Sequence, residues 1–212
     1  MNTSSGSTRQ ERRHQETRDE IVRAARGIVI ESGAQDLSLR EIARRTDFTP
    51  SALYRYFENG RQDILLEIAR GSLTVLEGHL RRVPTALPPD ERIIEMGVVY
   101  LQFARTHAQE IALIFDSLSA IGPLDDDTSD TDLLAPTGVF QLLADALREG
   151  VEQGIFVIAD GDQLLVMHGA WSYVHGLAVV ERMHVQHGCL FGDRARDLLR
   201  AFVNGLRMEW TR

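Results

Sequence analysis

The sequence SLREIARRTDFTPSALYRYFENGR, at residues 38–61, contains two helix starts separated by a short break. Ser38, followed three positions later by Glu41, predicts a reciprocal capping box, in which each side chain covers one unpaired amide at the start of a helix. The polar break TDF interrupts that helix. Thr49 and Pro50 then start a second helix, because threonine is a common N-cap and proline is favoured at the first helical position. We therefore expect a helix-turn-helix, a unit that proteins use to bind DNA.

The second of these helices should have one buried and one exposed side. Leu53 and Phe57 stand four residues apart and can both face the core. This arrangement leaves four polar side chains on the exposed side, where they can contact a binding partner: Ser51, Tyr54, Arg55 and Tyr56. Hydroxyl and guanidinium groups of this kind contact phosphates and base edges.

The rest of the chain carries the periodicity of amphipathic helices, and no alternating segment bounded by hairpin signals occurs. The one strand-like run, residues 155–158, is short. Helices are expected from a Thr17–Glu20 capping box to Gly33, and then at about 62–82, 90–106, 108–118, 139–153, 162–183 and 193–210. Residues 1–14 predict a disordered arm, and the acidic segment 122–136 predicts a mobile loop. The predicted fold is all-α with about nine helices, in a three-helix head at 15–62 and a larger body at 63–212.

Length and composition narrow the class of protein. A chain of 212 residues can hold one sizeable domain or two small ones with real cores. Cys189 is the only cysteine, so no disulfide can form within the chain. No apolar run approaches the length of a membrane span, and the N-terminal segment lacks the apolar centre of a secretory signal. We expect a cytoplasmic protein that does not enter a membrane.

The net charge of −8 at pH 7 is unevenly distributed. Residues 1–62 contain 11 Arg against 9 Asp and Glu, a net charge of +2, whereas residues 63–212 contain 12 Arg against 22 acidic residues, a net charge of −10. A head with a net charge of +2 attracts DNA only weakly by itself. Tight binding would therefore need two heads acting together.

Residues 17–69 resemble the DNA-binding head of the TetR family of transcriptional regulators. The resemblance rests on two adjacent alanines in the first helix, a Gly-ended turn, LSLREIARR and then ALYRYF, in the family's order and spacing. It implies a larger and variable helical body that dimerises and binds a small effector. The chain is predicted to be such a regulator and not an enzyme, with double-stranded operator DNA as its partner, and no cofactor is predicted.

The resemblance also assigns roles along the helix-turn-helix. Arg40 occupies a place from which the family reaches a base edge, and the start of the second helix points into the major groove. Arg61 is the candidate phosphate clamp, but one residue more than usual stands before it, so Asn59 or the Gly60 amide can share that contact. The predicted DNA-contacting residues are Ser38, Arg40, Thr49, Pro50, Ser51, Ala52, Tyr54, Arg55, Tyr56 and Arg61.

Some side chains of the head also have a purely structural interpretation. Tyr54 can pack between helices, and Arg44 and Arg45 are expected to be surface charges and not base contacts. Three arginines can follow the minor groove as a basic arm, although a solvated tail is favoured: Arg9, Arg12 and Arg13.

A second patch, AWSYVHGL at residues 170–177, resembles a C-terminal domain type of some TetR-like regulators that is named for its tryptophan, histidine and glycine. Trp171 and His175 lie one turn apart on the same helical face. That face is expected to line an effector cavity, or else to be satisfied core or a subunit seam. A mostly apolar cavity with a few polar tips would suit a hydrophobic or aromatic molecule. The tentative ligand-binding residues are Tyr100, Phe103, His107, Phe115, Met167, Trp171 and His175.

His184, His187 and Cys189 carry ligand atoms that suit zinc, but no clear fourth ligand accompanies them. No metal site is therefore predicted. Neither a base nor an oxyanion donor accompanies Cys189 as a nucleophile.

The predicted function is a homodimeric regulator, a repressor that a small hydrophobic or aromatic effector releases from a pseudo-palindromic operator. The helices at about 162–183 and 193–210 are expected to form the subunit seam. Effector binding is expected to change the spacing of the two heads through the helix at about 62–82. The alternative is a helical small-molecule or metal sensor whose DNA-binding head is not functional.

Overall fold

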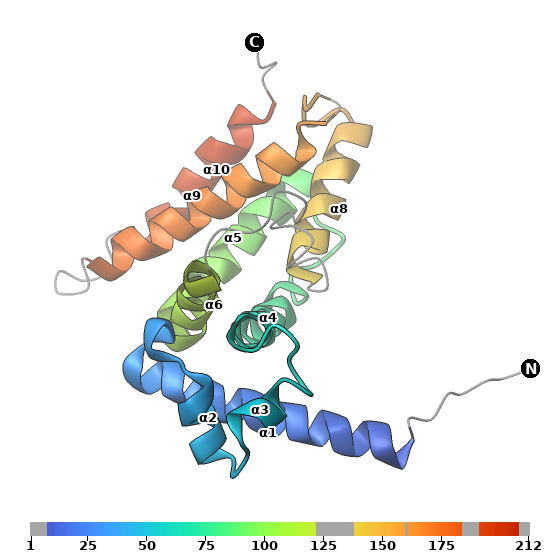
Figure 1. Ribbon diagram of the computed structural model, residues 1–212. Coiled ribbons are helices and arrows are strands. Elements are labelled where there is room, and N and C mark those ends of the chain that lie inside the picture. The colour runs from blue at the N-terminus through green and yellow to red at the C-terminus, as the bar shows by residue number, and fades with distance from the viewer. Residues whose placement is uncertain (1–7, 122–137, 160, 184–190, 208–212) are drawn as a thin grey trace, which may run out of the picture. The chain divides into compact units, whose positions relative to one another are not determined.

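The computed structural model describes residues 8–121, 138–159, 161–183 and 191–207, and within these ranges the chain forms nine α-helices and two 3₁₀ helices with no β-strand (Figure 1). The prediction of an all-α fold is confirmed. The chain divides into two compact units, Met1–Ser72 with Ile111–Asp130 and Leu73–Glu110 with Thr131–Arg212. We call them the head unit and the body unit.

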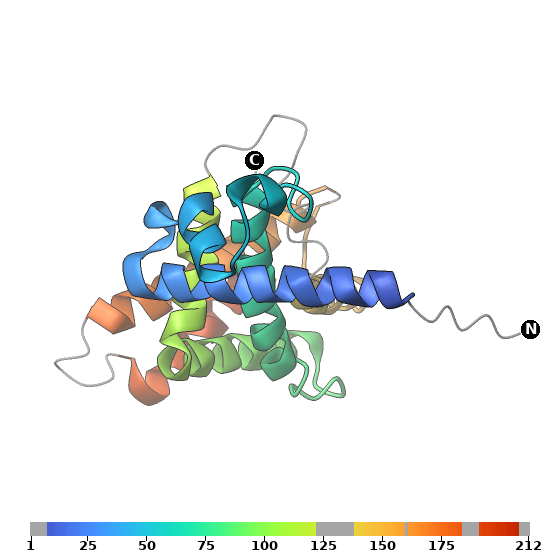
Figure 2. The same ribbon diagram turned by 60° about the horizontal axis from the view of Figure 1, so that its bottom comes forward.

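The head unit contains the predicted helix-turn-helix together with parts of two later helices. Figures 1 and 2 show α2 and α3 beside each other along α1, and α2 contacts both of these helices. The elements that contribute to this unit are α1 (Arg9–Ser32), η1 (Ala34–Asp36), α2 (Leu39–Arg45), α3 (Pro50–Leu53), α4 (Arg61–Leu80) and α6 (Ala108–Ile121).

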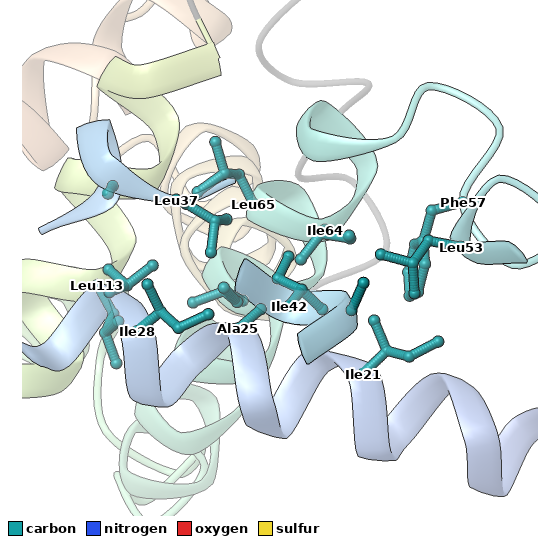
Figure 3. Close-up of a cluster of buried hydrophobic side chains, with 14 residues drawn as sticks. Ile21, Ala25, Ile28, Leu37, Ile42, Leu53, Phe57, Ile64, Leu65 and Leu113 are labelled. Carbon is teal, nitrogen blue, oxygen red and sulfur yellow. The ribbon is translucent and has the colours of Figure 1, made fainter. Parts of the chain in front are cut away.

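A cluster of buried apolar side chains holds the head unit together (Figure 3). α1 contributes Ile21, Ala25 and Ile28, which recur at helical spacing and are at most 2 % exposed. Leu53 and Phe57, which were predicted to face inward, are 0 % and 1 % exposed. Burying each large apolar side chain contributes about 1.5–3 kcal/mol. These contacts hold α3 in place, although a single helical turn is not stable by itself.

The first helix begins earlier than predicted. A reciprocal capping box forms between Thr8 and Glu11, so α1 starts at Arg9 and not after Thr17. Thr17 lies inside the helix, where its hydroxyl donates a hydrogen bond to the Arg13 carbonyl at 3.0 Å. Residues 9–14 are therefore helical, which corrects that part of the predicted disordered arm, and residues 1–7 lie outside the described residues. Both threonines are followed by glutamate at the third position, and helix formers between them favour the earlier start.

The body unit is built around α5, which contacts α8, α9 and α10. Observed and predicted helices agree within a few residues. The predicted loop at 122–136, the end of the predicted last helix and the possible zinc ligands His184, His187 and Cys189 lie outside the described residues. The elements of this unit are α5 (Pro89–Thr106), α8 (Gly138–Glu152), α9 (Gln163–Met183), η3 (Gly192–Arg194) and α10 (Ala195–Gly205), with the second half of α4.

α10 is fastened to α5 by close packing and by ion pairs. A side chain at Gly97 would meet Leu199, with its Cβ only 2.7 Å from the Leu199 Cδ2, so glycine permits the close approach. Two ion pairs join the same two helices, Glu95–Arg196 and Glu91–Arg200, and a third joins Asp90 of α5 to Arg207, just after α10 ends. Such partly exposed pairs contribute little individually, so they serve mainly to align the two helices.

The strand-like run at 155–158 forms no strand. Phe156 packs directly on Gly150, where an added Cβ would lie 2.2 Å from the phenylalanine ring. The Val157 amide donates one hydrogen bond to the Leu206 carbonyl at 2.9 Å. Apolar packing and not sheet pairing therefore explains the hydrophobic run.

Among the residues that the structure describes, no helix is long and apolar enough to cross a membrane.

Candidate nucleic-acid interface and effector cavity

Side-chain caps position the two helices of the helix-turn-helix. The Ser38 hydroxyl accepts a hydrogen bond from the Glu41 amide at 3.3 Å, and the Thr49 hydroxyl accepts one from the Ala52 amide at 3.2 Å. Both predicted N-caps are confirmed, with Pro50 in the first turn of α3. Asp47 makes the turn between the helices in the left-handed region, at φ 53°, which aspartate tolerates better than most residues.

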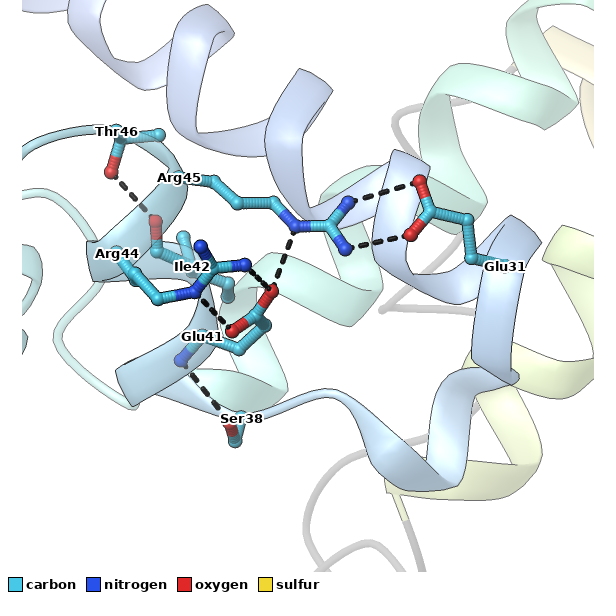
Figure 4. Close-up of polar contacts among 7 residues, drawn as sticks. All are labelled: Glu31, Ser38, Glu41, Ile42, Arg44, Arg45 and Thr46. Atoms are coloured by element: carbon cyan, nitrogen blue, oxygen red, sulfur yellow. Dashed lines mark hydrogen bonds and ion pairs between the residues drawn. The ribbon is translucent and has the colours of Figure 1, made fainter.

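The capping box predicted at Ser38 is only half formed (Figure 4). The Glu41 carboxylate accepts hydrogen bonds from Arg44 at 2.7 and 2.9 Å and from Arg45 at 2.9 Å, and does not cap the Ser38 amide. These bonds, first from Arg44 and then from Arg45, lower the pKa of Glu41 to about 2. Arg45 also makes a two-point ion pair with Glu31 of α1, at 2.6 and 3.1 Å. Arg44 and Arg45 are therefore engaged with carboxylates.

The start of α3 and the turn behind it present polar side chains to solvent. Thr49, Pro50 and Ser51 are exposed, whereas Ala52 is half-buried. Tyr54 is 52 % exposed, and its ring lies over Gly60, where an added Cβ would be 3.0 Å from the Tyr54 Cε1. About half of Tyr54 is therefore accessible to a partner.

Arg40 and Arg55 are the free cations of this surface. Both side chains are exposed, and neither makes a hydrogen bond or ion pair within the described part of the chain. An exposed guanidinium without a carboxylate partner can bind a phosphate or the edge of a guanine.

Tyr56 is more enclosed than its neighbour Tyr54. It is half-buried, its ring stacks on His14 with centroids 4.8 Å apart, and Phe48 meets it edge-on at 6.1 Å. The ring is therefore held in one orientation.

Arg61 does not offer a free guanidinium to a phosphate. Its Nε donates to the Leu37 carbonyl at 3.0 Å, its Nη1 to the Ala120 carbonyl at 2.9 Å, and its Nη2 to the Ala34 carbonyl at 2.8 Å. The side chain is half-buried and joins the loop before α2 to the end of α6. This geometry corrects the prediction that Arg61 clamps a phosphate.

The two substitutes considered for Arg61 are occupied as well. The Asn59 amide donates to the Asp63 carboxylate at 2.9 Å, and the Gly60 amide donates to the Phe57 carbonyl at 2.9 Å. Gly60 has a φ of 55°, in the region that favours glycine. The additional residue before Arg61 is therefore part of the turn that leads into α4.

The body unit contains an apolar cavity of about 70 Å³. Two of the predicted ligand-binding residues, Tyr100 and Trp171, line it, and their ring centroids lie 5.4 Å apart. Aromatic residues that were not predicted complete the wall: Phe140, Tyr173 and Phe202. Tyr173 stands two residues after Trp171 on α9, whereas Phe140 of α8 and Phe202 of α10 are distant in the sequence and no local signal links them to Trp171.

Polar atoms stand beside this apolar wall. The Tyr100 hydroxyl and the His175 Nδ1 lie 3.0 Å apart, within hydrogen-bonding distance. Burial raises the pKa of Tyr100, which keeps its proton on the oxygen. Partial burial, followed by the charge of Arg182, lowers the pKa of His175, so the imidazole is neutral at physiological pH.

The remaining predicted ligand residues do not line this cavity. Phe103 and His107 stack at 4.5 Å and meet His79, in a separate aromatic cluster at the end of α5. Met167 is buried away from the cavity wall, and Phe115 belongs to α6 in the head unit. The predicted set therefore does not form a single site. Among the described residues, no group of three or more side chains is arranged to hold a metal ion.

Two family models match the chain. The model of bacterial regulatory proteins of the tetR family matches residues 21–68, and the model of the tetracyclin repressor-like C-terminal domain matches residues 93–206, more than half of the chain. Comparison with curated proteins gave no match. The tryptophan-histidine-glycine subset is not singled out by these models and stays a prediction.

Solved structures share the fold. BioQ of Mycobacterium smegmatis is 26% identical, with a TM-score of 0.62, over 89% of this chain and 97% of that one. BioQ with its natural double-stranded DNA operator is 24% identical, with a TM-score of 0.61, over 91% and 98% of the two chains. RolR in complex with resorcinol is 16% identical, with a TM-score of 0.61, over 93% and 91%. With a matching head and a C-terminal model that covers more than half of its length, the chain belongs to the TetR family of transcriptional regulators.

Proposed function

We propose that this regulator is a homodimeric repressor, which binds a pseudo-palindromic operator and leaves it when a small hydrophobic or aromatic molecule binds the body unit. The observation that carries the proposal is the exposed polar surface around α3, with Arg40 and Arg55 free of partners in the described chain. BioQ, which has the same fold, is solved with a double-stranded DNA operator.

The proposed DNA contacts follow from exposure and chemistry. Side chains at the start of α3 enter the major groove, as in other helix-turn-helix units, and Arg40 and Arg55 reach base edges or phosphates. The tyrosine hydroxyls position the head on the phosphate backbone. The proposed set is Ser38, Arg40, Thr49, Pro50, Ser51, Ala52, Tyr54, Arg55 and Tyr56.

Dimerisation is proposed through α9 and α10. α9 exposes a stripe of small and apolar residues that recur at every third or fourth position, as in helices that pack against a partner helix. No heavy atom lies within 4 Å of a Cβ built at Gly169 or Gly176, so another helix can approach closely. The stripe consists of Leu165, Gly169, Ser172, Gly176, Val179 and Met183.

The effector is proposed to occupy the cavity around Trp171 and Tyr100. The cavity of about 70 Å³ is smaller than the roughly 300–1,000 Å³ of ordinary ligand sites. An effector must therefore displace the surrounding helices, which links binding to a change of conformation. The apolar wall favours an aromatic ring, and RolR, with the same fold, is solved with resorcinol.

DNA titration tests the proposal. The protein is incubated with genomic fragments at moderate salt, and bound fragments are compared with random DNA of equal length. Substituting Arg40→Ala together with Arg55→Ala should weaken specific binding at least about tenfold, because each two-point base contact contributes about 1–3 kcal/mol. Arg82→Ala, an exposed arginine of the body unit, is the control and should bind as the wild type does.

The outcome that contradicts DNA regulation is a wild-type protein that binds no fragment more tightly than random DNA. Small aromatic molecules, resorcinol among them, are then added to the specific complex. Release of DNA supports the repressor mechanism, and binding of an aromatic molecule without release contradicts it.

A further inference from the structure

The N-terminal part of α1 extends beyond the region that the tetR family model matches. That match begins at residue 21, whereas α1 begins at Arg9. The Thr8–Glu11 capping box closes the helix end, with the Glu11 amide 3.2 Å from the Thr8 hydroxyl. Figures 1 and 2 both show this end of α1 running past α2 and α3. The head thus carries about three additional helical turns.

One face of this extension is fastened to the turn that follows α3. The His14 ring stacks on Tyr56. One turn later, Arg18 donates a hydrogen bond to the Tyr56 carbonyl, and its guanidinium carbon lies 4.3 Å from the centre of the Phe57 ring. Arg18 also pairs with Glu67 of α4 at 3.5 Å. These contacts hold the extension in a definite position beside Tyr56, one of the proposed DNA contacts.

The extension also carries a group of unneutralised charges. Arg9, Arg12 and Arg13 are exposed, and their guanidinium groups make no hydrogen bond or ion pair within the described residues. Between Thr8 and His14 the only acidic side chain is Glu11, which is engaged in the cap. Arg18, Arg44 and Arg45 of the head are paired with carboxylates, whereas the three arginines of the extension are unpaired in the described part of the chain, as Arg40 and Arg55 are.

We propose that Arg9, Arg12 and Arg13 form a second DNA-contacting surface, which binds the phosphate backbone outside the bases covered by α3. The inference rests on the proposed function, because it requires the head to bind DNA. Arginines without carboxylate partners bind phosphates, and such contacts add affinity without adding sequence information. The contacts of His14 and Arg18 with Tyr56 fix the position of the helix that carries these arginines relative to the proposed DNA face.

This second surface also offsets the low net charge of the head. A net charge of +2 over residues 1–62 gives little electrostatic attraction when the charges are spread evenly. Three free cations on one helix end concentrate the attraction where DNA flanking the operator would pass.

The test compares two DNA duplexes. One contains only the operator selected from genomic fragments, and the other carries additional base pairs on both sides. Wild-type protein should bind the flanked duplex more tightly. The variant with Arg9→Gln, Arg12→Gln and Arg13→Gln keeps good helix formers and should lose that preference, with binding to the flanked duplex weakened by roughly tenfold. The slope of log K against log salt should fall by about 0.9 for each phosphate that the variant no longer binds.

A matched control removes the same charge elsewhere. Arg81, Arg82 and Arg148 are exposed residues of the body unit that lie outside α9 and α10, the helices proposed to pair in the dimer. Their combined change to glutamine should leave both the preference for flanking DNA and the salt slope unchanged. Circular dichroism of each variant confirms that helix content is retained.

The proposal is overturned if the α1 variant keeps the wild-type affinity, salt slope and flank preference while the Arg40→Ala, Arg55→Ala protein has lost binding. In that outcome the DNA-binding function stands and only the second surface is wrong. Failure of the wild type to prefer any fragment over random DNA instead removes the proposed function and this inference together.

Discussion

At the scale of single residues, Arg61 has a structural role. Its place in the sequence predicted a contact with a DNA phosphate, but its guanidinium binds carbonyls within the protein. Its three hydrogen bonds reach the Ala34, Leu37 and Ala120 carbonyls. These acceptors lie just before α2 and at the end of α6, so a single side chain ties both segments to the start of α4. Arginine suits this place because its planar fork presents several N–H donors in fixed directions.

Arg61→Gln and Arg61→Lys should therefore both destabilise the protein, by about 1–3 kcal/mol, since each leaves partly buried carbonyls without donors. Lysine carries the charge but cannot reach three divergent acceptors. The midpoints of denaturant unfolding measure the effect. Our structural assignment is wrong if Arg61→Lys is as stable as the wild type while Arg61→Gln alone lowers the salt slope of DNA binding, as a phosphate contact would.

At the scale of elements, local and long-range interactions compete for the same side chain in α2. Glu41 stands at the position of a capping box, but it binds Arg44 and Arg45 instead of the Ser38 amide. Arg45 in turn pairs with Glu31, so the chain of contacts ties α2 to α1. The charged pairs prevail because hydrogen bonds to an ionised group are stronger than a bond to a neutral amide.

This network makes the attachment of α2 depend on pH. The pKa of Glu41 is lowered from 4.5 to about 2, so its contribution is complete above pH 4.5 and is lost as the pH falls toward 2. Glu41→Gln removes the titrating group. The difference in unfolding midpoint between wild type and Glu41→Gln should therefore shrink as the pH is lowered through this range. A difference that stays constant from pH 7 to pH 2 would falsify the assignment.

At the scale of the whole molecule, charge and assembly depend on each other. A head of net charge +2 joined to a body of net charge −10 should bind DNA only weakly as a single copy. Two heads on one dimer bind as a linked pair, and linkage can raise affinity by about 10²–10⁴. Operator binding should therefore depend on the stripe of α9 that includes Gly176.

Gly176→Arg tests this dependence. A side chain fits there within one chain, because nothing lies within 4 Å of its Cβ, and arginine favours the helix more than glycine does. The charge should block helix pairing, shift the protein to monomer in sedimentation velocity, and weaken operator binding by about 100-fold or more. Gly78→Arg, at an equally open position on α4, should remain dimeric. A dimeric Gly176→Arg protein would place the seam elsewhere.

Local signals in the sequence were enough for much of this protein. The N-caps Ser38 and Thr49, the inward-facing Leu53 and Phe57 and the helix ranges all depend on groups within a few residues of one another, and the structure confirms them. The same local rule failed where two equivalent signals competed. Thr8 and Thr17 are both followed by glutamate at the third position, as in a capping box, and only the folded chain showed that α1 begins after Thr8.

Contacts between segments that are distant in the sequence were decided by the tertiary structure alone. Arg61 meets a carbonyl at Ala120, and Trp171 shares its cavity with Phe140 and Phe202, because helix packing brings these groups together. Periodicity tells which side of a helix is buried but not which helix covers it. The sequence by itself therefore determined the helices, the helix-turn-helix and the family resemblance, while packing decided which polar side chains are bonded within the protein and which remain exposed.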